Sequence, residues 1–189
     1  MNNIEIGPAI KHSYEFLTGV FSDTSKLLTI VEERMKKNKF HSLWGSASVW
    51  NRSAAYYGYY GWLPHYMSRV YVDTLSSENK PSLEKKLCVF VNIYFVPREL
   101  EQPVILFGVV KFRLEDIWTT WNNIMLNNEE PEFIDSDRIE EWKEIEVESE
   151  ASIDKIFYQI RRLTEIKNQP ATQAICDEAI KKFREVENV

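Results

Sequence analysis

LCVFVNIYFV, residues 87–96, and PVILFGVVKFR, residues 103–113, are two nearly continuous runs of β-branched and aromatic residues. Such residues favour strands because their side chains pack well on a pleated surface. Only the mainly polar segment 97–102 separates the two runs. A parallel return would need a crossover of a dozen or more residues, so the sequence predicts an antiparallel hairpin. Gly108, inside the second run, predicts a bulge or a close approach of two backbones.

Two helical patterns precede this hairpin. Apolar side chains at helical spacing follow Pro8, which suits a first helical turn, and predict a helix over 8–20. The segment SDT then offers an N-cap for a second helix, over 22–39, which ends among lysine and arginine side chains. An alternative is that these two segments form one kinked helix. Residues 66–74 are rich in strand-forming side chains and predict a further strand.

Helical patterns also follow the hairpin. Residues 115–126 predict a short amphipathic helix, because their tryptophan, isoleucine and methionine side chains fall on one face. Residues 143–148 alternate like an edge strand with charges on one side. From Ser152 to Leu163 the apolar residues again recur at helical spacing, and Pro170 suits the start of a last helix. The sequence therefore predicts two C-terminal helices.

These elements predict an α+β fold, with a mostly antiparallel sheet of three to five strands and N-terminal and C-terminal helix pairs packed on it. A chain of 189 residues suits one globular domain, residues 1–189. Its expected regions are helical 8–39, an aromatic block 43–66, a sheet region 66–113, a helix 115–126, an acidic loop 127–150 and C-terminal helices 152–187.

The charge of the chain is concentrated in one segment. The net charge is −6, yet residues 127–150 alone carry 11 acidic and 2 basic side chains, a balance of −9. We interpret this segment as a solvated loop extended by its own repulsion, with docking of a basic partner as the alternative. The remainder is near neutral, so the low isoelectric point does not exclude a polyanionic partner.

Several features indicate a soluble, cytoplasmic protein. Cys88 and Cys176 stand alone in apolar and helical patterns, and we expect buried thiols in a reducing compartment. The first residues lack the basic and apolar regions of a signal peptide. No run approaches the roughly 18 apolar residues of a membrane span. We therefore expect no membrane association.

Motifs for catalysis are missing from the sequence. It contains no GxxxxGK[ST] or GxGxxG phosphate loop, no GxSxG elbow and no HExxH. His12, His41 and His65 have no second ligand at helical or strand spacing. Val109 occupies the position where a metal-dependent nuclease would need the acidic residue of an ExK motif ending at Lys111. We therefore predict neither a cofactor nor a metal site.

The aromatic block is the candidate contact surface. Eight aromatic rings fall between residues 43 and 66, a density that one helix or strand cannot bury on a single face. They either form a core between helices and sheet, or some reach the surface to meet a partner. The residues predicted to make the contact are Trp50, Arg52, Tyr56, Tyr57, Tyr60, Trp62 and His65.

The sequence thus favours a non-catalytic intracellular binding protein, whose partner is another protein or a second copy of itself. One alternative is a metal-dependent enzyme that processes nucleic acids or nucleotides, with Asp73, Glu115 and Asp116 gathered in space. A third hypothesis is a single-stranded nucleic-acid binder that stacks bases on the aromatic block. In that case, binding should weaken steeply with salt, and Arg52→Ala should reduce the salt slope.

Overall fold

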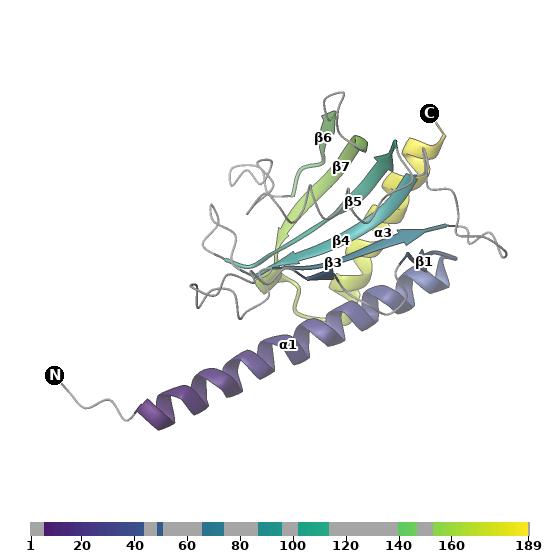
Figure 1. Ribbon diagram of the computed structural model, residues 1–189. Coiled ribbons are helices and arrows are strands. Elements are labelled where there is room, and N and C mark those ends of the chain that lie inside the picture. Colours follow the sequence, from purple (N-terminus) through teal and green to yellow (C-terminus); the bar gives the residue numbers. More distant parts are fainter. Residues whose placement is uncertain are drawn as a thin grey trace.

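A computed structural model describes residues 6–43, 49–50, 66–73, 87–95, 102–113, 140–146 and 153–188. Two helices and an antiparallel sheet make up this part of the chain (Figure 1). The helical elements are α1 (Ile6–Lys37), the 3-10 turn η3 (Leu163–Glu165) and α3 (Gln169–Glu187). The strands are β1 (His41–Ser42), β2 (Val49–Trp50), β3 (Tyr66–Val72), β4 (Leu87–Tyr94), β5 (Val104–Phe112), β6 (Lys143–Glu146) and β7 (Ile153–Arg162).

The sheet confirms the α+β class and is wider than predicted. Its order is β1-β3-β4-β5-β7-β6, and β2 also pairs with β3. Every pairing is antiparallel, including the predicted hairpin of β4 and β5. The predicted strand near residue 66 is β3, and the predicted edge strand is β6, which pairs only with β7 among the described strands. The predicted helix over 115–126 lies outside the described residues.

Both faces of the central strands are buried. On one face, Val89, Val91 and Phe107 pack in a cluster with side chains of α1 and α3. On the other face, Phe90 and Leu106 belong to a second apolar cluster. Strands that are buried on both faces need apolar residues at nearly every position. This explains the continuous apolar runs from which the hairpin was predicted.

The prediction of an N-terminal helix pair was wrong, and the alternative of a single helix is closer, because one continuous helix of 32 residues spans both predicted segments. The N-cap that was expected to separate them does not interrupt the backbone. Thr24 instead donates its hydroxyl hydrogen to the Val20 carbonyl within the helix, at 2.8 Å. Such bonds to the preceding turn let a threonine lie inside a helix.

The first of the two predicted C-terminal helices was also wrong, since residues 153–162 form strand β7. The register shifts between Lys111 and Phe112, so that Phe112 pairs with Ile153 whereas Lys111 pairs with Lys155. The extra residue at this bulge separates two side chains of the same face by three positions instead of two. Because both faces of β7 also carry apolar residues, its apolar positions recur at intervals typical of a helix. The members of that pattern are Ile153, Ile156, Phe157, Ile160 and Leu163.

Gly108 marks the close backbone approach that the sequence predicted. It lies in β5 opposite Tyr158 of β7. A methyl group there would overlap the carbonyl oxygen of Phe157 and lie 2.8 Å from the Tyr158 Cα. Any side chain at this position would therefore push β5 and β7 apart.

Candidate functional site

The N-terminal half of α1 carries large apolar side chains into solvent. Ile10 is 64% exposed, Tyr14 72% and Phe16 71%, and every residue from Gly7 to Phe16 is exposed. Figure 1 shows this half of the helix, coloured purple, extending beyond the sheet. We call Ile10 and Tyr14, which are four residues apart and lie on one side of the helix, the projecting face; Phe16, two residues after Tyr14, points to another side. Large exposed apolar groups gathered on one element are typical of interaction sites.

The projecting face results from the length of α1. Its 32 residues span about 48 Å at 1.5 Å per residue. The 9 residues of β5 span only about 30 Å. The six strands of the main path add up to about 24 Å across the sheet, at roughly 4.8 Å per neighbouring pair. The sheet is therefore too small to cover the whole helix, and the uncovered part is the N-terminal half.

The C-terminal half of α1 is firmly attached to the rest of the fold. Leu28, Val31 and Met35 are at most 4% exposed. Arg34 donates two hydrogen bonds to the carboxylate of Asp177 in α3, at 2.7 and 2.6 Å. These bonds raise the pKa of Arg34, so the guanidinium stays charged. The projecting half is thus an extension of a well-anchored helix.

On the side of α1 that carries Phe16 lies a groove of about 540 Å³. Val20, which follows Phe16 by four residues and so lies on the same side of the helix, begins its lining. Lys26 and Lys167 lie among its polar residues. Its apolar lining consists of Val20, Leu27 and Ile30 from α1, with Pro103, Leu163 and Ile166 across the groove. The groove therefore adjoins Phe16, whereas Ile10 and Tyr14 lie on another side of the helix.

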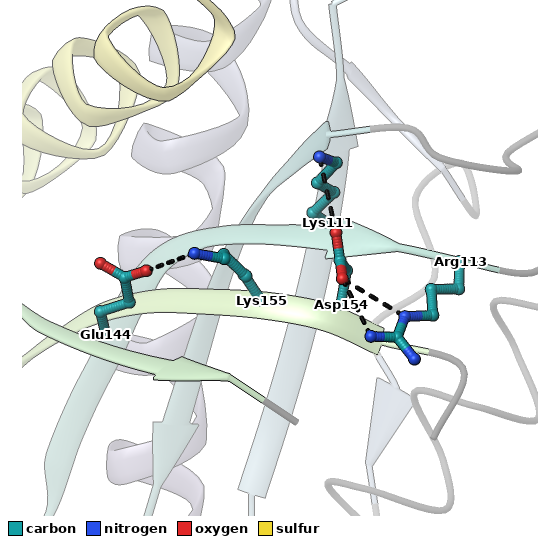
Figure 2. Close-up of polar contacts among 5 residues, drawn as sticks. All are labelled: Lys111, Arg113, Glu144, Asp154 and Lys155. Atoms are coloured by element: carbon teal, nitrogen blue, oxygen red, sulfur yellow. Dashed lines mark hydrogen bonds and ion pairs between the residues drawn. The ribbon is translucent and has the colours of Figure 1, made fainter. Parts of the chain in front are cut away.

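A cluster of charged residues lies where β5, β6 and β7 meet, and Figure 2 shows its side chains. Asp154 accepts hydrogen bonds from Arg113, at 3.1 and 3.3 Å, and pairs with Lys111 at 3.5 Å. Lys155 pairs with Glu144 at 2.8 Å. The bond from Arg113 is the main reason why the pKa of Asp154 is lowered. Each carboxylate faces a cation and is partly exposed, so we interpret this cluster as charge pairing between strands.

The sheet also contains a buried polar pair on the face away from α1 and α3. Ser68 of β3 and Asn92 of β4 lie directly opposite each other, and the Ser68 hydroxyl donates to the Asn92 side-chain oxygen. Next to them, the rings of Tyr66 and Tyr94 are 5.6 Å apart. Burial raises the pKa of Tyr66. A satisfied polar pair inside an apolar face specifies the register of the two strands.

Most of the predicted contact residues lie outside the described part of the chain. Of the seven, only Trp50 falls within it, in β2, where its backbone pairs with Met67 of β3. The remaining six are Arg52, Tyr56, Tyr57, Tyr60, Trp62 and His65, all outside the described residues. Aromatic contacts in the described part include those of Phe21 with Phe95 and of Phe40 with Phe183.

The residues proposed for metal-dependent chemistry are likewise only partly described. Asp73 follows β3, whereas Glu115 and Asp116 lie outside the described residues. His12 is exposed on α1, and His41 is half-buried in β1. Within the described ranges, no three histidine, cysteine, aspartate or glutamate side chains gather as metal ligands would. The described residues therefore add no support to the enzyme hypothesis.

Sequence reasoning missed the projecting face. It recognised the helical stripe that includes Ile10 and Tyr14, but assigned it to a helix packed on the sheet. The periodicity is the same in the covered and uncovered halves, so periodicity alone could not separate them. Comparing the predicted helical length, 8–39, with the short predicted strands would have indicated that part of the helix lacks cover.

Comparison with protein-family models, curated proteins and solved structures finds no match for this chain. Among the described residues, no helix is both long and apolar enough to cross a membrane. Both cysteines are free and buried, as predicted.

Because no known protein matches this chain, the function of the site is inferred from its own geometry.

Proposed function

We propose that this chain is a non-catalytic binding protein whose contact surface is made by the exposed apolar side chains of the N-terminal half of α1, together with the groove beside Phe16. The observation that carries the proposal is the exposure of 64 to 72% at three large apolar side chains within seven residues of one helix. Monomeric proteins rarely leave such groups together in water unless they meet a partner. Buried free thiols at Cys88 and Cys176 support a reducing, cytoplasmic location.

The chemistry of the surface favours a protein partner, and an α-helical segment fits it best. An apolar groove is a usual site for recognising an amphipathic helix, and the groove beside Phe16 offers one. Lys11 and Glu15 pair with each other at 3.8 Å, so the projecting half adds little net charge. A lipid-binding helix would instead carry several lysines or arginines on its polar face.

The aromatic block is proposed as a second contact surface, on the ring density of its sequence alone. Its enrichment in tyrosine and tryptophan suits protein recognition, because these side chains offer large contact area at low entropic cost. Nucleic-acid binding by the same rings stays a prediction, to be tested by its salt dependence.

Photocrosslinking inside cells tests the proposed surface. Benzoylphenylalanine replaces Phe16 in the full chain, and as a control it replaces Lys181, an exposed residue of α3. We expect discrete adducts from position 16, identified by mass spectrometry, and none of these adducts from position 181. Adding Val20→Glu should remove them, because Val20 lies on the same side of the helix as position 16 and the change places a charge in the apolar contact. Equal adduct patterns at both positions, or none at position 16, would contradict the proposal.

A further inference from the structure

The apolar stripe of α1 follows the spacing of a coiled coil. Successive positions are separated by four and then three residues along almost the whole helix. This alternation is the heptad pattern that lets two helices pack side chains into each other along a common seam. The stripe consists of Ile10, Tyr14, Leu17, Phe21, Leu28, Val31 and Met35, with the buried polar residue Thr24 at the position between Phe21 and Leu28.

The same stripe is packed in one half of the helix and free in the other. Leu28 and Val31 are 4% and 0% exposed in the cluster that includes α3 and the sheet. Phe21 still contacts the ring of Phe95, at 5.7 Å between centroids. Ile10 and Tyr14 are 64% and 72% exposed. The exposed residues therefore extend, along the same helix, the stripe whose other half already packs against α3 and the sheet. A further helix would cover these exposed residues.

The charge of this half of α1 restricts which helices can pack favourably against its exposed residues. Between Gly7 and Ser22, only Lys11 and Glu15 carry a formal charge, and they balance each other. A strongly acidic or basic partner would gain no electrostatic attraction here. A second copy would present the same neutral, heptad-spaced stripe, and would meet neither net repulsion nor a mismatch in spacing.

We propose that the partner of the projecting face is a second copy of this chain, which forms a two-fold antiparallel helix pair along residues 10–21. This inference rests on the proposed function. Two-fold dimers are the commonest protein assemblies, and they bring the same patch of both subunits together. In the antiparallel arrangement, Tyr14 lies opposite Leu17 of the second copy, and Ile10 lies opposite its Phe21. Because each sheet is attached to the C-terminal half of its α1, this orientation places the two sheets at opposite ends.

The exposed area predicts a weak dimer. At about 200 Å² for a large apolar side chain, Ile10 and Tyr14 together offer roughly 270 Å² per copy. The pair would bury about 540 Å² from these residues, well below the roughly 1,200–2,000 Å² of stable complexes. We therefore expect a dissociation constant on the order of 100 µM, so that the dimer forms only in concentrated protein.

Sedimentation equilibrium of the full chain from about 1 to 500 µM tests this inference. The mass of one chain is 22.3 kDa, and we expect the weight-average mass to rise toward twice that value. Tyr14→Glu should remain monomeric throughout, because the dimer would bury its charge. His12→Glu, which adds the same charge on the opposite side of the helix, should dimerise like the wild type. Far-ultraviolet circular dichroism at low concentration checks that both variants are folded.

Three outcomes would overturn self-pairing through this seam. They are a wild type that stays monomeric at 500 µM, a dimer that survives Tyr14→Glu, and a dimer lost equally in His12→Glu. For the orientation, an oxidised mixture of Tyr14→Cys and Leu17→Cys chains should give mainly the mixed disulfide. Mainly same-position disulfides would instead mean a parallel pair. A monomeric wild type whose position 16 still crosslinks to another protein in cells would refute self-pairing alone and leave the proposed function standing.

Discussion

Leu28→Ala and Ile10→Ala remove similar aliphatic groups from the same stripe of α1, and they should differ sharply in their effect on stability. Leu28 is 4% exposed, and truncating a buried leucine costs about 2–5 kcal/mol in the free energy of unfolding. Ile10 is 64% exposed, so only about a third of the roughly 1.5–3 kcal/mol of full burial is at stake. The higher helix propensity of alanine offsets part of that loss. We expect Ile10→Ala to cost less than about 0.5 kcal/mol.

Urea unfolding followed by circular dichroism measures both differences. The protein concentration should be near 1 µM, so that self-association does not add to the apparent stability. The midpoint should fall clearly for Leu28→Ala and hardly move for Ile10→Ala, with unchanged slopes. A loss above about 1.5 kcal/mol for Ile10→Ala would refute the reasoning, because it would mean that Ile10 is packed within its own chain.

Three further predictions concern the sheet and the buried thiol. Gly108→Ala should destabilise the protein by about 3 kcal/mol or more, or prevent folding. Gly19→Ala, whose methyl group meets open space on α1, should instead stabilise the protein by about 0.5–1 kcal/mol. Thermal unfolding compares the two variants, and equal effects would contradict the close approach of β5 and β7 at Gly108. Burial raises the pKa of Cys176 to about 12, so an alkylating reagent at pH 8 should not modify this thiol in native protein until denaturant is added. Peptide mass spectrometry detects the modification, and rapid labelling of native protein would be inconsistent with the burial of Cys176. The pKa of Asp154 is lowered in the folded state, so its ion pairs stabilise the protein above the unfolded pKa of about 3.9, and this stabilisation is lost as the pH falls through the folded pKa. The difference in unfolding free energy between wild type and Asp154→Asn should therefore shrink below about pH 4. A difference that grows below about pH 4 would contradict the pairing.

The central strands were predictable because burial on both faces leaves a simple signal. Val89 and Phe90 point to opposite faces and are both 0% exposed, so β4 appears in the sequence as an unbroken apolar run. Strand β7 was not predictable in the same way. Its bulge near Asp154 turns a two-residue alternation into helix-like spacing, and a bulge depends on the neighbouring strand as much as on local sequence.

The candidate site was not predictable from local patterns either. Tyr14 and Val31 belong to one stripe with one spacing, yet the first is 72% exposed and the second is 0% exposed. The difference depends on where the sheet ends, which is a property of the assembled fold. The predicted aromatic contact surface lies largely outside the described residues, so its role stays a prediction.

Amide hydrogen exchange along α1 tests most directly whether one helix has a packed half and a free half. At about 1 µM, amides of residues 10–17 should exchange fast, because a short helical segment without tertiary contacts is only marginally stable. Amides of residues 28–35 should exchange orders of magnitude more slowly. Raising the concentration to several hundred micromolar should protect only the first group. Equal, strong protection of both groups in dilute protein would contradict the account, since it would mean that the projecting face is already covered within the chain.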